Sequence, residues 1–126
     1  MNLYTSYFGN AKTLKANGIY ILPIVAHLPK WWNGENYSKL APKYSMLHLD
    51  ESEYTKQYKE LVRLLNPEKI YREICSYSEF DIALICYEKP GDFCHRHLVA
   101  EWLNSNLHLD IAEFATKPLE LPLLLF

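Results

Sequence analysis

The 126-residue sequence has no long hydrophobic run and no even set of cysteines, and its first residues do not predict a secretory leader. Its apolar runs are far shorter than the about 18 residues that a membrane-spanning helix needs, so no membrane segment is expected. Three cysteines on a chain without a leader do not indicate a disulfide framework. These absences together favour a reducing cytoplasm as the compartment.

A strong charge of one sign is also missing, because the net charge is only -2. Extended nucleic-acid binding needs a broadly basic face and is therefore not expected, although a local basic pocket is compatible with this charge. What the chain has in quantity is hydrophobic residues, at 49%, and aromatic residues, at 14%. This composition is sufficient for a buried core, and the length suits one domain over residues 1–126.

Strand-like and helix-like patterns alternate along the chain. Strands are expected at 2–8, 19–28, 81–88 and 109–114, and helices at 11–18, 51–65, 67–75 and 94–105. Residues 29–49 follow no regular period, and a connection of this length in a small domain is often functional. We therefore predict an α/β protein, a single layered domain with a small, mostly parallel sheet of about four strands flanked by helices.

Single residues mark the ends of several of these elements. Gly18 is expected to end the first helix in the left-handed conformation, and Pro23 places its strand at a sheet edge or at a bulge. Asp50 and Asn66 are the expected N-cap residues of the second and third helices. The unbroken apolar stretch from Ile82 to Cys86 is typical of a central strand that is buried on both faces.

Polar and aromatic side chains gather where the predicted strands end. In parallel sheets, ligands bind beyond the carboxyl ends of the strands, so we expect these residues to share one site. The candidate ligand-binding residues are Thr5, Ser6, Tyr7, Lys30, Trp31, Trp32 and Arg96, and the candidate catalytic residues are Glu88, Cys94 and His95.

The stretch that opens the last long helix carries most of this chemistry. With Asp92 or Phe93 as the cap, Cys94 falls in the first helical turn, where the helix dipole and neighbouring cations favour a nucleophilic thiolate. His95 is then the acid–base group. Glu88 is either an acid–base group or a contact to a ribose hydroxyl. The alternative is that Cys94 packs on the sheet and Glu88 braces the loop.

Two further interpretations concern the ligand. Arg96 with the helix N-terminus forms a candidate anion site, or else it pairs with Glu88 or Glu101 and braces the loop. Trp31 and Trp32 could stack a base, although one of them could equally fill the core. On an extended segment, neighbouring side chains point to opposite sides, so at most one of the two is expected to face a ligand.

Metal binding is not indicated by the spacing. Cys86, Cys94, His95 and His97 are all candidate zinc ligands, but the sequence contains no Cys-x-x-Cys pair. On a helix, His95 and His97 would point about 200° apart and could not chelate one ion together. We therefore predict no metal site and no cofactor.

The motif "CYEKPGDFCHRHLVAEWL" at 86–103, together with "YTSYFGN" at 4–10, resembles the domain of unknown function 488 family of small bacterial and bacteriophage proteins. The family signature is Cys-x-Glu at a strand end, followed by Cys-His-Arg at a helix start. The resemblance implies an α/β fold and a shared site along the whole chain, but no established reaction. It also implies a bacterial cytoplasm or, for a phage protein, that of its host.

Two hypotheses for the function follow. The first is that the chain binds, or acts on, a nucleotide-like or phosphorylated small molecule; a phage protein that sequesters a host signalling nucleotide is one form of it. The second is a protein-interaction module with a purely structural motif. In that case the apolar tail "LPLLLF" at 121–126 would bind a partner or join two copies of the chain.

Overall fold

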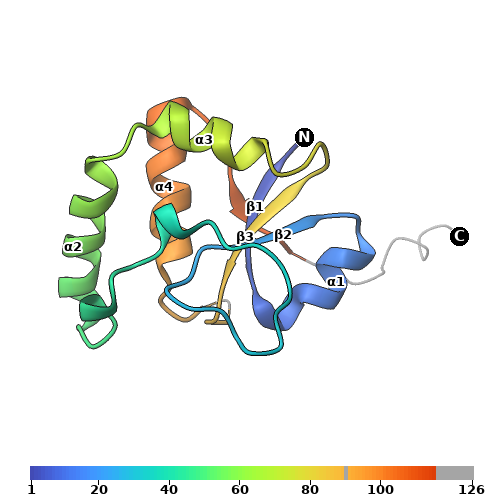
Figure 1. The fold of residues 1–126 in the computed structure, drawn as a ribbon. Helices are drawn as coiled ribbons and strands as arrows, with labels where there is room; N and C mark the ends of the chain where they lie inside the picture. The colour runs from blue at the N-terminus through green and yellow to red at the C-terminus, as the bar shows by residue number, and fades with distance from the viewer. Residues whose placement is uncertain (90, 116–126) are drawn as a thin grey trace, which may run out of the picture.

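The computed structural model describes residues 1–89 and 91–115 of the chain. It contains a four-stranded sheet and four α-helices, in the alternating order that the sequence indicates (Figure 1). The strands are β1 (Leu3–Tyr7), β2 (Tyr20–Pro23), β3 (Ile82–Cys86) and β4 (Ala112–Glu113), and the helices are α1 (Ala11–Ala16), α2 (Glu51–Arg63), α3 (Pro67–Cys75) and α4 (His95–Leu107). The predicted tail contact at 121–126 lies outside the described residues.

All strand pairs in the described sheet are parallel, and the strand order is β2-β3-β1-β4. Leu3 of β1 and Tyr20 of β2 both pair with Ile82, so β3 has a neighbour on each side. Every residue of β3 is buried, as its unbroken apolar sequence predicts. The predicted small α/β fold is therefore confirmed.

The sheet separates two hydrophobic clusters. Figure 1 shows α2, α3 and α4 on one side of the sheet and α1 on the other. Because side chains alternate along a strand, Ile82 and Leu84 pack toward the larger helices, whereas Ala83 and Ile85 pack toward α1. This two-sided packing fixes the carboxyl end of β3 in the middle of one sheet edge.

Most of the predicted element ends are confirmed. Asp50 accepts a hydrogen bond from the Glu53 backbone N–H at 2.8 Å, and Asn66 accepts one from Lys69 at 3.1 Å. Gly18 has a φ of +72°, which a side chain would disfavour, and it ends the turn after α1. Pro23 lies on the edge strand β2, where its missing N–H costs no ladder hydrogen bond.

The start of α4 differs from the prediction. Cys94 is itself the N-cap residue, with an extended φ of -154° and ψ of 145°, and the helix begins at His95. The expectation that Asp92 or Phe93 would be the cap is wrong. Cys94 makes no side-chain capping hydrogen bond, which agrees with the weak acceptor strength of sulfur.

The irregular segment between β2 and α2 folds over the carboxyl edge of the sheet (Figure 1). It includes two short 3-10 helices, Ser38–Leu40 and Tyr44–Met46, that the sequence pattern did not indicate. The buried Tyr58 hydroxyl of α2 donates to the Leu40 carbonyl at 2.6 Å and ties the segment to the helix layer. None of the helices in the described ranges is long and apolar enough to cross a bilayer.

Candidate functional site: a thiol pair at the carboxyl edge of the sheet

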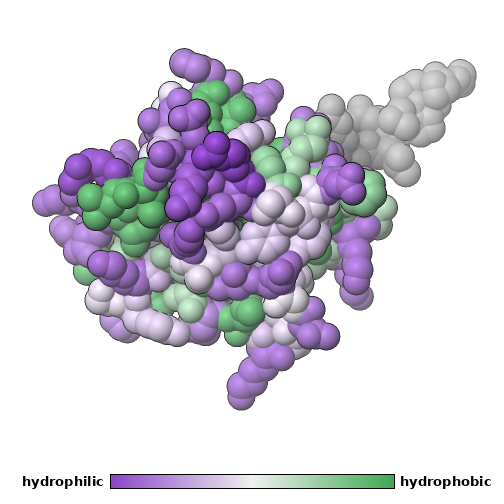
Figure 2. All heavy atoms as spheres, turned by 45° about the horizontal axis from the view of Figure 1, so that its top comes forward, coloured by the Kyte–Doolittle hydropathy of each residue, from purple (hydrophilic) through white to green (hydrophobic). Residues whose placement is uncertain are grey.

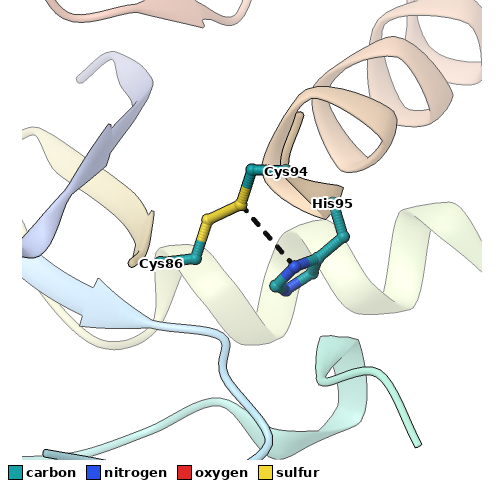
Figure 3. A group of neighbouring side chains, drawn as sticks. All are labelled: Cys86, Cys94 and His95. Atoms are coloured by element: carbon teal, nitrogen blue, oxygen red, sulfur yellow. Dashed lines mark hydrogen bonds between the residues drawn. A yellow bond between two sulfur atoms is a disulfide. The ribbon is translucent and has the colours of Figure 1, made fainter. Parts of the chain in front are cut away.

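Cys86 ends β3, and Cys94 lies directly before α4. Their sulfur atoms are joined in a disulfide, although the residues are eight positions apart (Figure 3). The sequence did not indicate a disulfide, and the structure corrects that expectation for this pair. The cause is that α4 begins beside the carboxyl end of β3, which brings Cys94 back to the strand end that the chain has just left. Cys75 is free and half-buried on α3.

His95 lies next to this pair with both ring nitrogens in defined surroundings. Its Nε2 is 2.6 Å from the Ile24 carbonyl oxygen, and its Nδ1 is 3.8 Å from the Cys94 sulfur (Figure 3). A carbonyl only accepts hydrogen bonds, so Nε2 carries the proton and Nδ1 presents a lone pair to the sulfur. Burial, with a smaller effect from Arg96, lowers the pKa of His95 to about 4. The imidazole is therefore neutral near pH 7.

Arg96, the next residue of α4, has a fully buried side chain that is 0% exposed. Its Nη1 donates to the Cys86 sulfur at 3.1 Å and to the Glu88 carbonyl oxygen at 2.8 Å. Its Nε and Nη2 donate to the two carboxylate oxygens of Glu113 at 3.0 and 2.9 Å. The guanidinium is thus occupied by internal partners and does not face solvent as the anion-site interpretation requires.

The bracing alternative for Arg96 describes these contacts better, but its partner differs from the expectation. The carboxylate partner is Glu113 of β4, whereas Glu88 contributes only its backbone oxygen. On the surface, Glu101 Oε1 instead lies 3.9 Å from Lys59 Nζ. No pattern in the sequence indicates Glu113, because β4 approaches α4 only after the chain has completed the helix and turned back.

A cavity of about 290 Å³ opens beside the two sulfurs, and we call it the thiol pocket. It lies beyond the carboxyl ends of β2 and β3, the edge of a parallel sheet at which ligands bind. Its lining is mainly apolar and aromatic, and consists of Val25, Ala26, His27, Pro42, Leu47, Leu49, Tyr54, Cys86, Tyr87, Glu88, Phe93, Cys94 and His95. The three candidate catalytic residues all lie in this wall.

Two phenols and one carboxylate supply most of the remaining polarity of the thiol pocket. Burial raises the pKa of Tyr54 and of Tyr87, and the nearby Glu88 carboxylate raises both further. Both hydroxyls therefore stay protonated near pH 7. The Tyr87 hydroxyl donates to the His27 carbonyl at 2.9 Å, whereas the Tyr54 hydroxyl has no hydrogen-bond partner among the described residues. Tyr54 is thus a donor that a bound molecule can use.

The candidate residues of β1 do not line the thiol pocket. Thr5 and Ser6 are buried, and the Thr5 hydroxyl donates to a Glu113 carboxylate oxygen at 2.7 Å. Ser6 accepts a hydrogen bond from Asn10 at 3.1 Å. The Tyr7 ring lies against Gly9, where an added Cβ would come within 2.6 Å of it. In this structure Thr5 helps to position Glu113, and through it Arg96.

The two tryptophans line a different cavity, an open groove of about 600 Å³ next to α1. We call it the tryptophan groove; it shares no lining residue with the thiol pocket, and Lys30 lines neither. Trp31 is 65% exposed, and both rings make edge contacts with Phe8. Both tryptophans line this groove because the segment is not extended: the Trp32 backbone N–H donates to the Pro29 carbonyl at 3.0 Å and the chain turns here. That at most one of the two faces a ligand stays a prediction.

The fold and the site together define a small α/β protein with a paired-cysteine pocket at the carboxyl edge of a parallel sheet. Residues 27–107 match the model of the DUF488-N3a family, described as the active DUF488-N3 subclade. The chain belongs to this family. No curated protein and no solved structure matches the chain.

The matched range bears directly on the site. It includes Cys86 and Cys94 of the disulfide, His95 and Arg96. It also includes every lining residue of the thiol pocket except Val25 and Ala26. It also includes both tryptophans, but it leaves out β1 and Glu113. The family resemblance is therefore shown over 27–107 and not over the "YTSYFGN" segment.

Proposed function

We propose that the thiol pocket binds a small nucleoside-like molecule and that the reduced cysteine pair reacts with it. The observation that carries this proposal is one cavity wall that holds Cys86, Cys94 and His95 at the ligand-binding edge of the sheet. The pocket is at the lower end of the about 300–1,000 Å³ range of ligand cavities, which favours a small ligand.

The residues that line the thiol pocket suit a ligand with a planar ring and with hydroxyl or amino groups. Tyr54, Tyr87 and Phe93 offer aromatic surface, and Glu88 offers a carboxylate that can accept from a ribose hydroxyl or a ring amine. No lysine or arginine is among the described lining residues. A phosphate group on the ligand would therefore extend out of the pocket, and Arg96 would not hold it.

The reduced thiols differ in their surroundings, which suggests separate roles. The Arg96 N–H next to the Cys86 sulfur stabilises a thiolate at Cys86. Cys94 faces the neutral Nδ1 of His95, which can accept the thiol proton as the Cys94 sulfur adds to a ring double bond of the ligand. The displaced electron pair of that double bond then takes the proton back from His95, so the step needs no leaving group. We therefore retain Cys94 as the nucleophile, His95 as the base and Glu88 as the acid or hydroxyl contact.

Thermal shift under reducing conditions tests the proposal. Nucleobases, nucleosides and nucleotides are added to the full chain; a ligand at 100 times its Kd stabilises a protein by about 2.7 kcal/mol. We expect nucleosides to raise the Tm. Ala26→Trp, which fills the thiol pocket, should abolish the rise, whereas Ala11→Trp in the tryptophan groove should retain it.

Other outcomes would show whether the binding site or the ligand class is wrong. If Ala11→Trp or Trp31→Ala abolishes the rise and Ala26→Trp does not, the ligand binds in the tryptophan groove, beside Lys12 and Lys15. If no compound in the panel raises the Tm of the unaltered chain, the nucleoside proposal fails. Circular dichroism of each variant shows that the comparison is between folded proteins.

The protein-interaction hypothesis remains the alternative. On the face drawn in Figure 2, hydrophobic side chains form small separate areas among hydrophilic ones, which gives this hypothesis less support than the pocket gives the first. Size-exclusion chromatography with and without residues 118–126 tests the proposed association through the tail. A cytoplasmic location, in a bacterium or in a phage host, is also a proposal, and it agrees with a thiol pair that works in the reduced state.

A further inference from the structure

We propose that Cys86, Cys94 and His95 in the reduced protein bind one thiophilic metal ion of the Zn²⁺ class. Their two sulfurs and one imidazole nitrogen lie within 4.8 Å of one another (Figure 3). Thiolate sulfur and imidazole nitrogen are the ligands that zinc prefers. A bound ion would occupy the Cys94 sulfur and His95 Nδ1, so the metal-bound form and the thiol reaction proposed above are alternative states of the reduced protein.

The spacing of the donor atoms suits an ion. Zinc lies about 2.3 Å from sulfur and about 2.0–2.1 Å from nitrogen, so a tetrahedral site separates the two donors by about 3.6 Å. The distance from the Cys94 sulfur to His95 Nδ1 is 3.8 Å. The Cα atoms of Cys86 and Cys94 are 7.3 Å apart, a separation that leaves room for two reduced sulfurs to lie on either side of an ion.

The orientation of His95 is a second, independent observation. A metal-bound histidine usually donates its other N–H to a carbonyl or carboxylate, which fixes the ring and its tautomer. Here Nε2 donates to the Ile24 carbonyl at 2.6 Å, and the unprotonated Nδ1 faces the sulfurs. The ring is therefore already held in the form and the orientation that a ligand requires.

The charges also balance around such an ion. Two thiolates neutralise a divalent cation, and the Arg96 charge is neutralised by the two-point contact with Glu113. The Arg96 N–H at 3.1 Å from the Cys86 sulfur then acts as an outer hydrogen bond to a bound thiolate. This balance matters because Cys86, Cys94, His95 and Arg96 are all buried.

Three protein ligands leave one of four tetrahedral positions open. The three ligand residues all line the thiol pocket, so the open position would face a bound molecule or water. Zinc sites with three protein ligands and one open position are typical of catalysis, whereas structural sites use four. All three residues were candidate ligands from the sequence, but two of them are adjacent and the third is eight positions before Cys94, a spacing that matches no zinc motif. For that reason no metal site was predicted.

Cobalt titration tests the site, because Co²⁺ bound to thiolates absorbs light in the near ultraviolet and visible ranges. Metal-free, fully reduced chain is titrated with Co²⁺, and Zn²⁺ is then added as competitor. We expect saturation at one Co²⁺ per chain and loss of the absorbance with Zn²⁺. Cys86→Ser and His95→Gln should each weaken binding at least about tenfold, whereas Cys75→Ser should not.

A measurement on the unaltered chain avoids any folding defect in the variants. Reduced protein is treated with iodoacetamide with and without Zn²⁺, and the labelled positions are assigned by peptide fragmentation. We expect Zn²⁺ to slow labelling of Cys86 and Cys94 and to leave Cys75 unaffected. Three outcomes would each overturn the proposal. They are equal labelling rates with and without Zn²⁺, a Co²⁺ titration that does not saturate at one ion per chain, and a loss of binding that occurs only in Cys75→Ser.

Discussion

Arg96 and Glu113 form a two-point ion pair that joins the first turn of α4 to the edge strand β4. The Nε–Oε1 and Nη2–Oε2 distances are 3.0 and 2.9 Å. The same guanidinium contacts the Cys86 sulfur, so the pair also sets the position of β3 relative to α4. One buried cation thus connects three elements at the sheet edge that forms the thiol pocket.

Removing the carboxylate should therefore destabilise the fold. Glu113→Ala leaves the 0% exposed Arg96 without its charged partner, and uncompensated buried charges cost about 3–5 kcal/mol. We expect the free energy of unfolding to fall by about 3 kcal/mol, the low end of this range, because the Glu113 side chain is 24% exposed. Urea unfolding at an unchanged m-value measures the loss. Glu60→Ala, which breaks an exposed pair with Arg63, is the control; an equal loss in both variants would contradict the argument.

Stability should decrease in acid because of His95. Its folded-state pKa of about 4 lies below the about 6.5 of an unfolded histidine. Between these two pH values the unfolded chain binds a proton that the folded chain does not. The contribution of His95 to the free energy of unfolding is therefore complete above pH 6.5 and is lost as the pH falls toward 4. The total loss from this group is about 3 kcal/mol, at about 1.4 kcal/mol per pKa unit.

The variant His95→Gln should make this acid-dependent loss smaller, as measured by urea unfolding at a series of pH values. Part of the loss should remain, because burial also lowers the pKa of His97. His48→Gln, at an exposed histidine and with the His95 ring in place, is the matched control for the substitution itself. A slope that is the same in all three proteins would show that His95 does not titrate as described.

The Tyr58 hydroxyl should matter for both stability and the thiol pocket. Tyr58→Phe leaves the Leu40 carbonyl without its 2.6 Å donor, and an unsatisfied buried group costs about 1–3 kcal/mol. Because this bond holds the segment that carries Pro42 and Leu47 of the pocket wall, ligand affinity should fall as well. Thermal unfolding and ligand titration measure both effects. Tyr4→Phe, at a residue that does not line the pocket and whose hydroxyl has no hydrogen-bond partner among the described residues, should change neither of them.

The oxidised chain should contain one reactive thiol out of three. Alkylation in denaturant should modify only Cys75 without reductant and all three cysteines after reduction. Since the bond closes a loop of sequence separation 8, reduction should lower stability by about 2.5 kcal/mol in the loop-entropy description. In Cys75→Ser, no alkylation should occur before reduction; any other count would contradict the Cys86–Cys94 pairing.

Local patterns were sufficient for most of the fold. The helix caps at Asp50 and Asn66, the left-handed Gly18 and the buried strand from Ile82 to Cys86 all depend on a few neighbouring residues. Each was predicted from sequence and is confirmed. The start of α4 was missed by one residue, because cysteine is an uncommon cap and nothing nearby distinguishes it from the first turn.

The composition of the site could be predicted only in part. Cys94, His95 and Glu88 were expected together, and they do line one cavity. Trp31 and Trp32 were expected in the same place, but they lie in a separate groove, because the chain turns after Pro29. The roles of Glu113 and Ile24 had no sequence signal, since each depends on a contact between elements far apart in the chain.

The sequence by itself determined the order of elements, their approximate bounds and the reactive residue types, since alternation, caps and turns act over a few residues. Tertiary structure alone decided the partner of each reactive group. Arg96 binds Glu113 inside the protein, His95 turns Nδ1 to the sulfurs, and Cys86 meets Cys94. These pairings follow from the packing of α4 against a sheet whose neighbouring strands are distant in sequence.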